Sequence, residues 1–229
     1  MQCQKVVIAG NAQWPPYTVQ QDNILSGIGI DLAKRIFSEL DVAYEEIAYD
    51  NIGHMMQGLR DGEIDVIVST YDYDGIMRDV QLLQPAYMID PVTIAVANET
   101  RSSITSWDSL IGSNGIAEET FVPEDQISEF LSNYLNLSFA QHLLAALQSV
   151  KTGANKYMVG SELQLTYGIK ANHLQSDLTV MKNLAKGGDV YMAFSNASPC
   201  KQYAVYVQKR LQDYKNNGTV DKILQKYIH

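Results

Sequence analysis

The loop at residues 10–18 carries side chains suited to holding a small ligand. It follows an apolar run at residues 5–9 and contains Asn11, Trp14 and Tyr17. An indole face offers apolar area and a cation-π surface for an ammonium or guanidinium group, worth about 0.5 to 2 kcal/mol. Trp14 could instead pack on a core, and Asn11 could instead cap a turn. Tyr17 is a third candidate, for which packing inside the loop is the commoner role.

A second loop, after the apolar run at residues 64–68, offers hydroxyl and charged groups. Ser69, Thr70 and Asp72 follow this run, and ligands of parallel sheets sit beyond the carboxyl ends of the strands. Arg78 comes next, and its planar guanidinium can hold a carboxylate with two parallel hydrogen bonds. The alternative is a solvated Arg78 or one paired with Asp79.

The sequence offers no pattern for metal binding or covalent catalysis. Its 4 histidines are scattered without paired spacing, whereas a structural zinc site needs about four clustered ligands. No Ser-His-Asp constellation and no phosphate-binding loop is recognisable. We therefore expect no metal, no cofactor and no catalytic residue.

The 229-residue chain is acidic, with 17 Lys and Arg against 26 Asp and Glu, a net charge of −9 and a pI near 4.8. This charge disfavours nucleic acid or an anionic lipid surface as the main partner. Hydrophobic residues make up 46% of the chain, which is enough for a folded protein with a sizeable core. No apolar run approaches the ~20 residues that span a bilayer, and the first residues lack the layout of a signal peptide.

Hydrophobic periodicity predicts that strands and helices alternate along the chain. The expected strands are residues 5–10, 42–47, 64–68, 91–97, 115–117, 157–159 and 190–194. The expected helices are residues 28–40, 54–60, 126–134, 139–150 and 200–215. This alternation favours an α/β fold with mainly parallel sheets. The composition becomes polar after Ala97, where we expect a domain boundary.

Four segments, taken in order, resemble a known family. They are WPPY at 14–17, GIGIDLAK at 27–34, GEIDVI at 62–67 and YKNNGTVDKI at 214–223. The series resembles the periplasmic solute-binding proteins of family 3, the polar amino-acid receptors of bacterial ABC transporters. The resemblance covers nearly the whole chain and is faint from about residue 101 to 189. It implies a type 2 periplasmic binding fold, in which two α/β lobes close over a ligand by a hinge movement.

The resemblance also implies how the chain is divided. Lobe 1 would hold residues 1–97 and 190–229, and lobe 2 would be the inserted residues 98–189, with crossing strands at 92–97 and 190–194. Gly29 departs from the family signature, which usually carries an acid at this scaffold position.

In lobe 1 the resemblance gives Trp14 a place against the ligand. Arg78 is near the family's carboxylate-clamping arginine, although it comes one residue late after the strand. Asp72 is an acid where the family more often has Ser or Thr. Our hypothesis is that Asp72 binds the ammonium group of the ligand, because a buried ammonium without an acid would be costly.

In lobe 2 the resemblance implies that Thr120 helps to hold the carboxylate. Glu119 could select a cationic ligand side chain, although a solvated acidic turn is the commoner explanation. Ser161 is the residue that aligns with the family's acid for the α-amino group, and Glu162 lies beside it. If neither replaces that acid, the ligand could lack an amino group.

The two cysteines, Cys3 and Cys200, lie at opposite ends of the chain. Composition alone leaves a long-range disulfide and two free thiols about equally open. The implied lobes would place both residues in lobe 1, so we expect a disulfide, with free thiols or a lipidated Cys3 as alternatives. Such a bridge is nominally worth about 4 to 5 kcal/mol.

The leading functional hypothesis is a non-enzymatic, periplasmic receptor that passes a small zwitterion to the membrane permease of an ABC transporter. A basic or polar amino acid is the favoured ligand, a monomer is expected, and a signal peptide would lie outside the given sequence. One alternative is the ligand-sensing domain of a membrane receptor. Another is a dehydratase-like enzyme on the same scaffold, for which Glu118, Glu119 or Glu162 would be the general acid or base.

Overall fold

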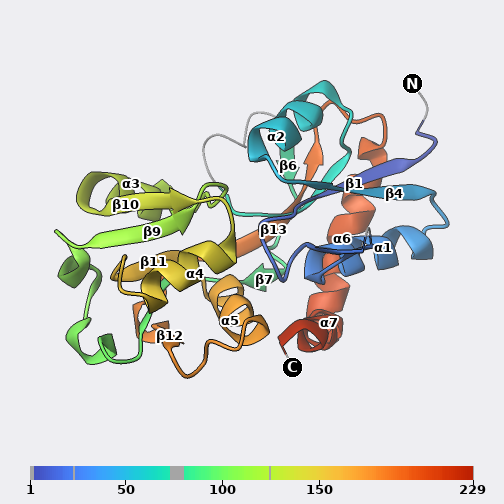
Figure 1. Cartoon of the computed structure of the whole chain (residues 1–229). Helices are drawn as coiled ribbons and strands as arrows, with labels where there is room; N and C mark the ends of the chain where they lie inside the picture. Colours follow the sequence, from blue (N-terminus) through green and yellow to red (C-terminus); the bar gives the residue numbers. More distant parts are fainter. Residues whose placement is uncertain (1–2, 23, 73–79, 124, 229) are drawn as a thin grey trace. The chain divides into compact units, whose positions relative to one another are not determined.

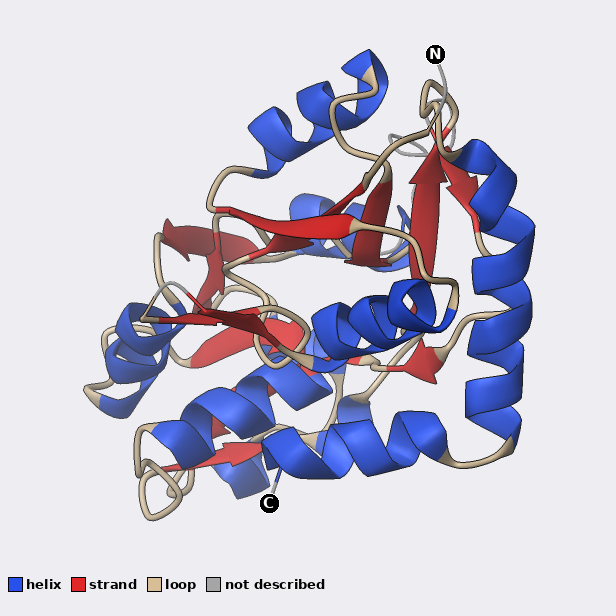
Figure 2. Ribbon diagram, turned by 90° about the vertical axis from the view of Figure 1, so that its right-hand side faces the viewer, coloured by secondary structure: helices blue, strands red, loops and turns tan. Residues whose placement is uncertain are grey.

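The computed structural model describes residues 3–22, 24–72, 80–123 and 125–228. The chain divides into two compact units, each an α/β assembly of strands and packed helices (Figures 1 and 2). The first unit is Met1–Ile89 with Asp189–His229, and the second is Asp90–Gly188. The α/β fold class expected from the sequence is confirmed.

The first unit is built on a mixed sheet with the strand order β4-β1-β5-β13-β6, and β7 also pairs with β13. Its strands are β1 (Val6–Asn11), β4 (Tyr44–Tyr49), β5 (Val66–Thr70), β6 (Val80–Leu82), β7 (Met88–Ile89) and β13 (Asp189–Ser195). β4 and β5 run parallel to β1, whereas β13 runs antiparallel to β5 and β6. A separate hairpin joins β2 (Val19–Gln21) and β3 (Ile24–Ser26).

The helices of the first unit are α1 (Ile28–Glu39), α2 (Ile52–Asp61), α6 (Ala204–Asn216) and α7 (Thr219–Ile228), with a 3-10 turn at Lys201–Tyr203. Helix α1 buries Ile28, Leu32 and Ile36, one residue every turn, as its sequence periodicity predicts. The helix lies so close to β5 that a Cβ on Gly29 would come within 2.6 Å of the Ser69 hydroxyl oxygen. A larger side chain at this position would therefore require Ser69 or Val68 to shift.

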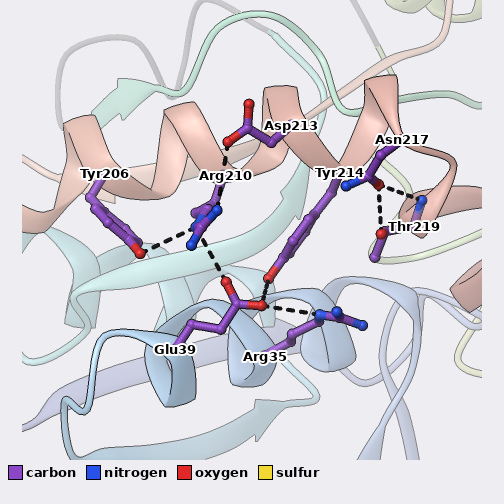
Figure 3. Close-up of polar contacts among 8 residues, drawn as sticks. All are labelled: Arg35, Glu39, Tyr206, Arg210, Asp213, Tyr214, Asn217 and Thr219. Atoms are coloured by element: carbon purple, nitrogen blue, oxygen red, sulfur yellow. Dashed lines mark hydrogen bonds and ion pairs between the residues drawn. The ribbon is translucent and has the colours of Figure 1, made fainter.

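Glu39, at the end of α1, joins that helix to α6 through a polar network (Figure 3). Its carboxylate accepts a 2.6 Å hydrogen bond from the Tyr214 hydroxyl and lies 3.3 Å from the Arg35 Nε and 3.2 Å from the Arg210 Nε. The Tyr214 hydrogen bond is the main cause that lowers the pKa of Glu39 below its ordinary value. At neutral pH this network holds a carboxylate anion among cationic and hydroxyl donors.

The second unit has a five-stranded sheet with the order β10-β9-β11-β8-β12. Its strands are β8 (Val92–Ala97), β9 (Asn114–Glu118), β10 (Asn136–Ala140), β11 (Tyr157–Ser161) and β12 (Leu178–Val180). β10 and β11 run parallel to β9, and β8 runs antiparallel to β11 and β12. Its helices are α3 (Asp125–Tyr134), α4 (Leu143–Lys151) and α5 (Glu162–Ala171), with 3-10 turns at Arg101–Ser103, Trp107–Leu110 and Lys182–Leu184.

Each face of this second sheet has its own core. Ala117 packs with Trp107 and Leu131 on one face, while the preceding residue, Ile116, packs with Leu147 and Leu165 on the other. Alternation of side chains along a strand is the physical reason. Residues on either side of Ala117, including Glu118, therefore point toward α4 and α5.

Some elements of the fold differ from the sequence expectations. The helix expected over residues 139–150 begins only at Leu143, because Asn136–Ala140 is a strand that pairs along its whole length with β9. Helix α5 and the short strands β2, β3, β6, β7 and β12 were not expected. Strand β8 pairs with β11 and β12 inside the second unit, Asp90–Gly188. The lobe boundary expected after Ala97 stays a prediction.

The two segments of the first unit are joined covalently. Cys3 and Cys200 form a disulfide across 197 positions of sequence, which confirms the expected bridge. Among the described residues, no helix is both long enough and apolar enough to cross a membrane.

Candidate functional site

The candidate residues of the first unit collect at one edge of its sheet. Because β1 and β5 are parallel, their carboxyl ends at Asn11 and Thr70 lie at the same edge. The antiparallel β13 begins there, and its Tyr191 is paired with Thr70. The structure thus brings together the two loops that the sequence singled out.

Trp14 lies in an aromatic cluster at this edge. Its ring centroid is 4.7 Å from that of Tyr17 and 5.0 Å from that of Tyr71, both at an interplanar angle of 47°. Trp14 is 9% exposed, and Tyr17 is completely buried with its hydroxyl 3.2 Å from the Met88 sulfur. These contacts place Tyr17 in the core and leave a small area of Trp14 exposed to solvent. Whether either residue touches a ligand stays a prediction.

Three polar candidates at this edge make local hydrogen bonds. The Asn11 side-chain oxygen accepts from the Gln13 backbone N–H at 3.0 Å, as a turn cap would. The Ser69 hydroxyl lies 2.7 Å from the Tyr87 hydroxyl, and the Thr70 hydroxyl donates to the Tyr71 carbonyl at 2.9 Å. All three candidates are buried. They hold the loops in place, and a ligand role for them stays a prediction.

Asp72 follows these residues and is exposed. Burial is the main cause that raises the pKa of the nearby Tyr191 hydroxyl, and the negative charges of Asp189 and Asp72 raise it further. Asp72 and Asp189 therefore bring negative charge to this edge of the sheet. Arg78, the expected carboxylate ligand, lies outside the described residues.

The candidates of the second unit also meet at one edge of a sheet. β9 and β11 are parallel and end at Glu118 and Ser161. Glu119 and Thr120 form the turn after β9, where Glu119 is exposed and Thr120 is half-buried. These two side chains are placed where a ligand at the carboxyl ends of the strands could reach them.

Ser161 and Glu162 begin helix α5. Ser161 is fully buried, and its side chain accepts a 3.3 Å hydrogen bond from the Gln164 backbone N–H as the N-cap of the helix. The Glu162 carboxylate is 2.9 Å from the Lys182 ammonium. Since Glu162 already has a cationic partner, a ligand ammonium would have to compete with Lys182.

Glu118 is the most perturbed acid among the described residues. It is 1% exposed, it accepts a hydrogen bond from the Gln164 side-chain amide, and its Oε1 atom has no hydrogen-bond partner. Burial raises its pKa from 4.5 to about 8, against the opposing effects of Gln164 and the Leu143 backbone N–H. At neutral pH it is therefore mostly an uncharged carboxylic acid.

The described residues include no cluster of three His, Cys, Asp or Glu side chains that could hold a metal ion. Two of the surface cavities lined by described residues lie apart from the candidate residues. One, of about 380 Å³, is lined by residues of α1 and α7, and the other, of about 330 Å³, lies near Asn114 and Lys156. Neither contains a candidate ligand residue.

The sequence profile of the bacterial extracellular solute-binding proteins, family 3, matches residues 6–229. The chain belongs to this family. No curated protein matches the chain. The match to the family profile confirms the resemblance inferred from the four segments.

Solved structures show the same fold at low sequence identity. An amino acid ABC transporter substrate-binding protein from Streptococcus pneumoniae, bound to L-arginine, has a TM-score of 0.79 at 23% identity, covering 98% of this chain and 94% of that one. The GluR0 ligand-binding core, in complex with L-glutamate, has a TM-score of 0.82 at 13% identity over 100% and 99% of the two chains. An ancestral amino acid-binding protein, described as a precursor of cyclohexadienyl dehydratase, has a TM-score of 0.78 at 20% identity over 99% and 96%.

The structure adds residues that the sequence did not mark as site members of this solute-binding protein. Tyr71 completes the cluster on Trp14, and Tyr191 with Asp189 adds polar groups at the edge of the first sheet. Tyr71 could have been found from the sequence, because it is an aromatic residue directly after Ser69 and Thr70. Asp189 and Tyr191 gave none, because they reach this edge only through the antiparallel pairing of β13 with β5.

Proposed function

We propose that the chain is a non-enzymatic, periplasmic receptor whose two lobes close on an amino acid and deliver it to an ABC transporter. The observation that carries the proposal is the match to the solute-binding family from residue 6 to residue 229. No catalytic group is needed for this function. Excluding water around the ligand would strengthen each charge-assisted hydrogen bond.

For the first lobe we propose that the ligand's two charged ends have different partners. Arg78 would hold the α-carboxylate, for which its planar fork of donors is suited. Asp72 would hold the ammonium group, and its exposure at the end of β5 leaves its carboxylate accessible. The negative charges of Asp72 and Asp189 near Tyr191 support a ligand with a cationic end. Trp14 would contribute apolar contact beside them.

For the second lobe we propose that Thr120 binds the carboxylate and that Glu119 biases the choice of ligand side chain. Ser161 aligns with the family's amino-group acid and already caps α5. Glu162 is paired with Lys182. These two contacts support a receptor that takes its ammonium partner from the first lobe, at Asp72.

Two related functions compete with this proposal. A ligand-sensing domain of a membrane receptor would use the same binding physics, so ligand affinity alone would not separate it from a transport receptor. A dehydratase-like enzyme would need a general acid or base, and the raised pKa of Glu118 favours it. The near-complete burial of Glu118 argues against contact with a substrate.

The proposal is tested by thermal unfolding with a panel of amino acids, small carboxylates and polyamines, after the protein has been unfolded and refolded to release any carried-over ligand. A ligand at about 100 times its dissociation constant stabilises a protein by about 2.7 kcal/mol, which raises the melting temperature by several degrees. We expect a shift with at least one amino acid. That shift should disappear in Arg78→Ala and weaken in Asp72→Asn.

Arg101→Ala is the matched control, because Arg101 is an exposed arginine of a 3-10 turn in the second unit. It should keep the shift unchanged. If no amino acid shifts the melting temperature, the amino-acid proposal fails. If amino acids bind as tightly to Asp72→Asn as to the original protein, the ammonium role of Asp72 is wrong.

A further inference from the structure

Strand β10 forms an outer edge of the second sheet and differs from the other edges. It has five residues, Asn136–Ala140, and none of them is charged or proline. The opposite edge strand, β12, has three residues. In the first unit the edge strand β4 carries Glu45 and Glu46, which pair with lysines at 2.6 Å. Charged or short edges discourage pairing with another chain, and β10 has neither protection.

The outward backbone groups of β10 can be assigned from one hydrogen bond. The Ala140 carbonyl accepts from the Glu119 N–H at 3.0 Å, so the backbone of Ala140 faces the β9 side. In a strand, backbone groups of alternate residues point to the same side. Ser138 therefore also faces β9, and the N–H and C=O groups of Leu137 and Phe139 face outward.

The side chains of these two residues share one face of the sheet. Leu137 packs against the core that contains Leu131, while Phe139 is 62% exposed. An exposed phenylalanine on an uncharged edge provides apolar area beside open hydrogen-bonding groups. This combination matches the chemistry of an added strand that is itself apolar and uncharged.

We propose that β10 docks against β10 of a second copy of this chain, antiparallel, about a two-fold axis at Ser138. In this register Leu137 of one copy lies opposite Phe139 of the other. Both residues have outward backbone groups, so each such pair can exchange two hydrogen bonds, four in the whole ladder. The register also places Phe139 against Leu137 of the second copy on the same face, which covers exposed apolar area.

The lack of charged residues on β10 limits the repulsion between like copies at this contact. Each copy has a net charge of −9, so most pairs of surfaces would repel each other. Two uncharged β10 strands bring no like charges together at the centre of the contact. A single pair of short strands falls below the ~1,000 Å² of a stable interface, so we expect a weak dimer that forms at high protein concentration.

Sedimentation equilibrium from micromolar to millimolar protein tests the proposal on the full chain. We expect reversible dimers, and Phe139→Lys should lower the association constant at least about 10-fold, since a charge on an edge strand blocks pairing. Ile47→Lys is the matched control, because Ile47 is 37% exposed on the edge strand β4 of the first unit. It should associate as the original protein does.

A cross-linking experiment tests the register independently of binding strength. Residues opposite each other at non-hydrogen-bonded positions have Cα atoms about 4.5 Å apart, within the range of a disulfide. Ser138→Cys should therefore form a covalent dimer under mild oxidation. Asn136→Cys should not, because two residues 136 would be about 13 Å apart along the strands. Cys3 and Cys200 are already bonded, so the new thiol is the one that reacts.

Three outcomes would overturn the proposal. They are a protein that stays monomeric at millimolar concentration, a Phe139→Lys variant that associates like the original protein, and equal cross-linking of the two cysteine variants. Thermal melting of each variant establishes that it is folded before association is compared. None of these measurements depends on the ligand proposed above.

Discussion

Glu39 in the first unit and Glu118 in the second show how differently one side chain behaves in two environments. Glu39 is exposed to water. Its carboxylate accepts hydrogen bonds from Tyr214 and Arg35 and forms an ion pair with Arg210, and these interactions lower its pKa. Glu118 is 1% exposed, and burial raises its pKa to about 8 although Gln164 donates to it. Hydrogen-bond donors favour the carboxylate, and loss of water favours the neutral acid. In the second unit the loss of water has the larger effect.

The two residues therefore affect stability with opposite signs as pH changes. For Glu118 the folded protein binds a proton more tightly than the unfolded chain between pH 4.5 and about 8. Stability from this residue is complete below pH 4.5 and is lost as the pH rises through that window. For Glu39 the folded pKa lies below 4.5, so its contribution is present above that pH and is lost in acid.

The largest expected effect comes from Glu118→Gln. The amide keeps the shape of the side chain and cannot ionise, so the variant should be more stable than the original protein by about 3 to 5 kcal/mol at pH 9. Urea unfolding from pH 4 to 9 measures the difference, which should grow between pH 4.5 and about 8. Glu119→Gln, at the exposed neighbouring position, should leave the pH dependence as it is. Parallel curves for the original protein and Glu118→Gln would refute the prediction.

A smaller effect is expected from Gln164→Leu. This change removes a donor that lowers the pKa of Glu118, so that pKa should rise above about 8. Loss of the buried hydrogen bond should also cost about 1 to 3 kcal/mol at neutral pH. Carbon-13 NMR titration of the Glu118 carboxyl group measures the first effect, with Gln175→Leu, at an exposed position, as the control. A Glu118 pKa that falls in Gln164→Leu would show that Gln164 does not stabilise the carboxylate.

The smallest effect is expected from Glu39→Gln, because exposed ion pairs are weakened by water and salt. We expect a loss of about 0.5 to 1 kcal/mol at pH 7 and low salt. The loss should shrink in high salt and vanish in acid, where Glu39 of the original protein is itself protonated. Urea unfolding at several salt concentrations measures it, and Glu63→Gln, at an exposed position, is the control. A loss that persists at pH 2 would mean that packing, rather than charge, accounts for the effect.

The sequence predicted helices well where the apolar stripe is continuous. In α1 the buried residues recur every three or four positions, and the expected and observed helices nearly coincide. In α5 a buried Gln164 and a central Gly168 interrupt the stripe, and the helix was not expected. Phe139 and Ala140, the last residues of strand β10, fell within the helix expected over residues 139–150, because Asn136–Phe139 alternates over only four residues and an apolar helical run follows directly.

The candidate site, like the helices and strands, could be predicted only in part. The loops after β1 and β5 could be predicted because a parallel strand sends its following loop to the carboxyl edge of the sheet. The contacts within those loops could not be predicted. The Ser69 hydroxyl is hydrogen-bonded to Tyr87, and Trp14 packs against Tyr71. Both contacts join segments that are separate in the sequence, so no local pattern encodes them.

The sequence by itself determined the family and the α/β class, whereas the Cys3–Cys200 bridge and the discontinuous first lobe were expected only through the resemblance to that family. The family and the class depend on periodicity, on turn residues and on the order of motifs, which are properties of neighbouring residues. Only the tertiary structure decided the state of Glu118. Its environment is made by Leu143 and Gln164, which are distant in sequence, and by the exclusion of water from between them. Desolvation is a property of the packed protein, so no local sequence pattern encodes it.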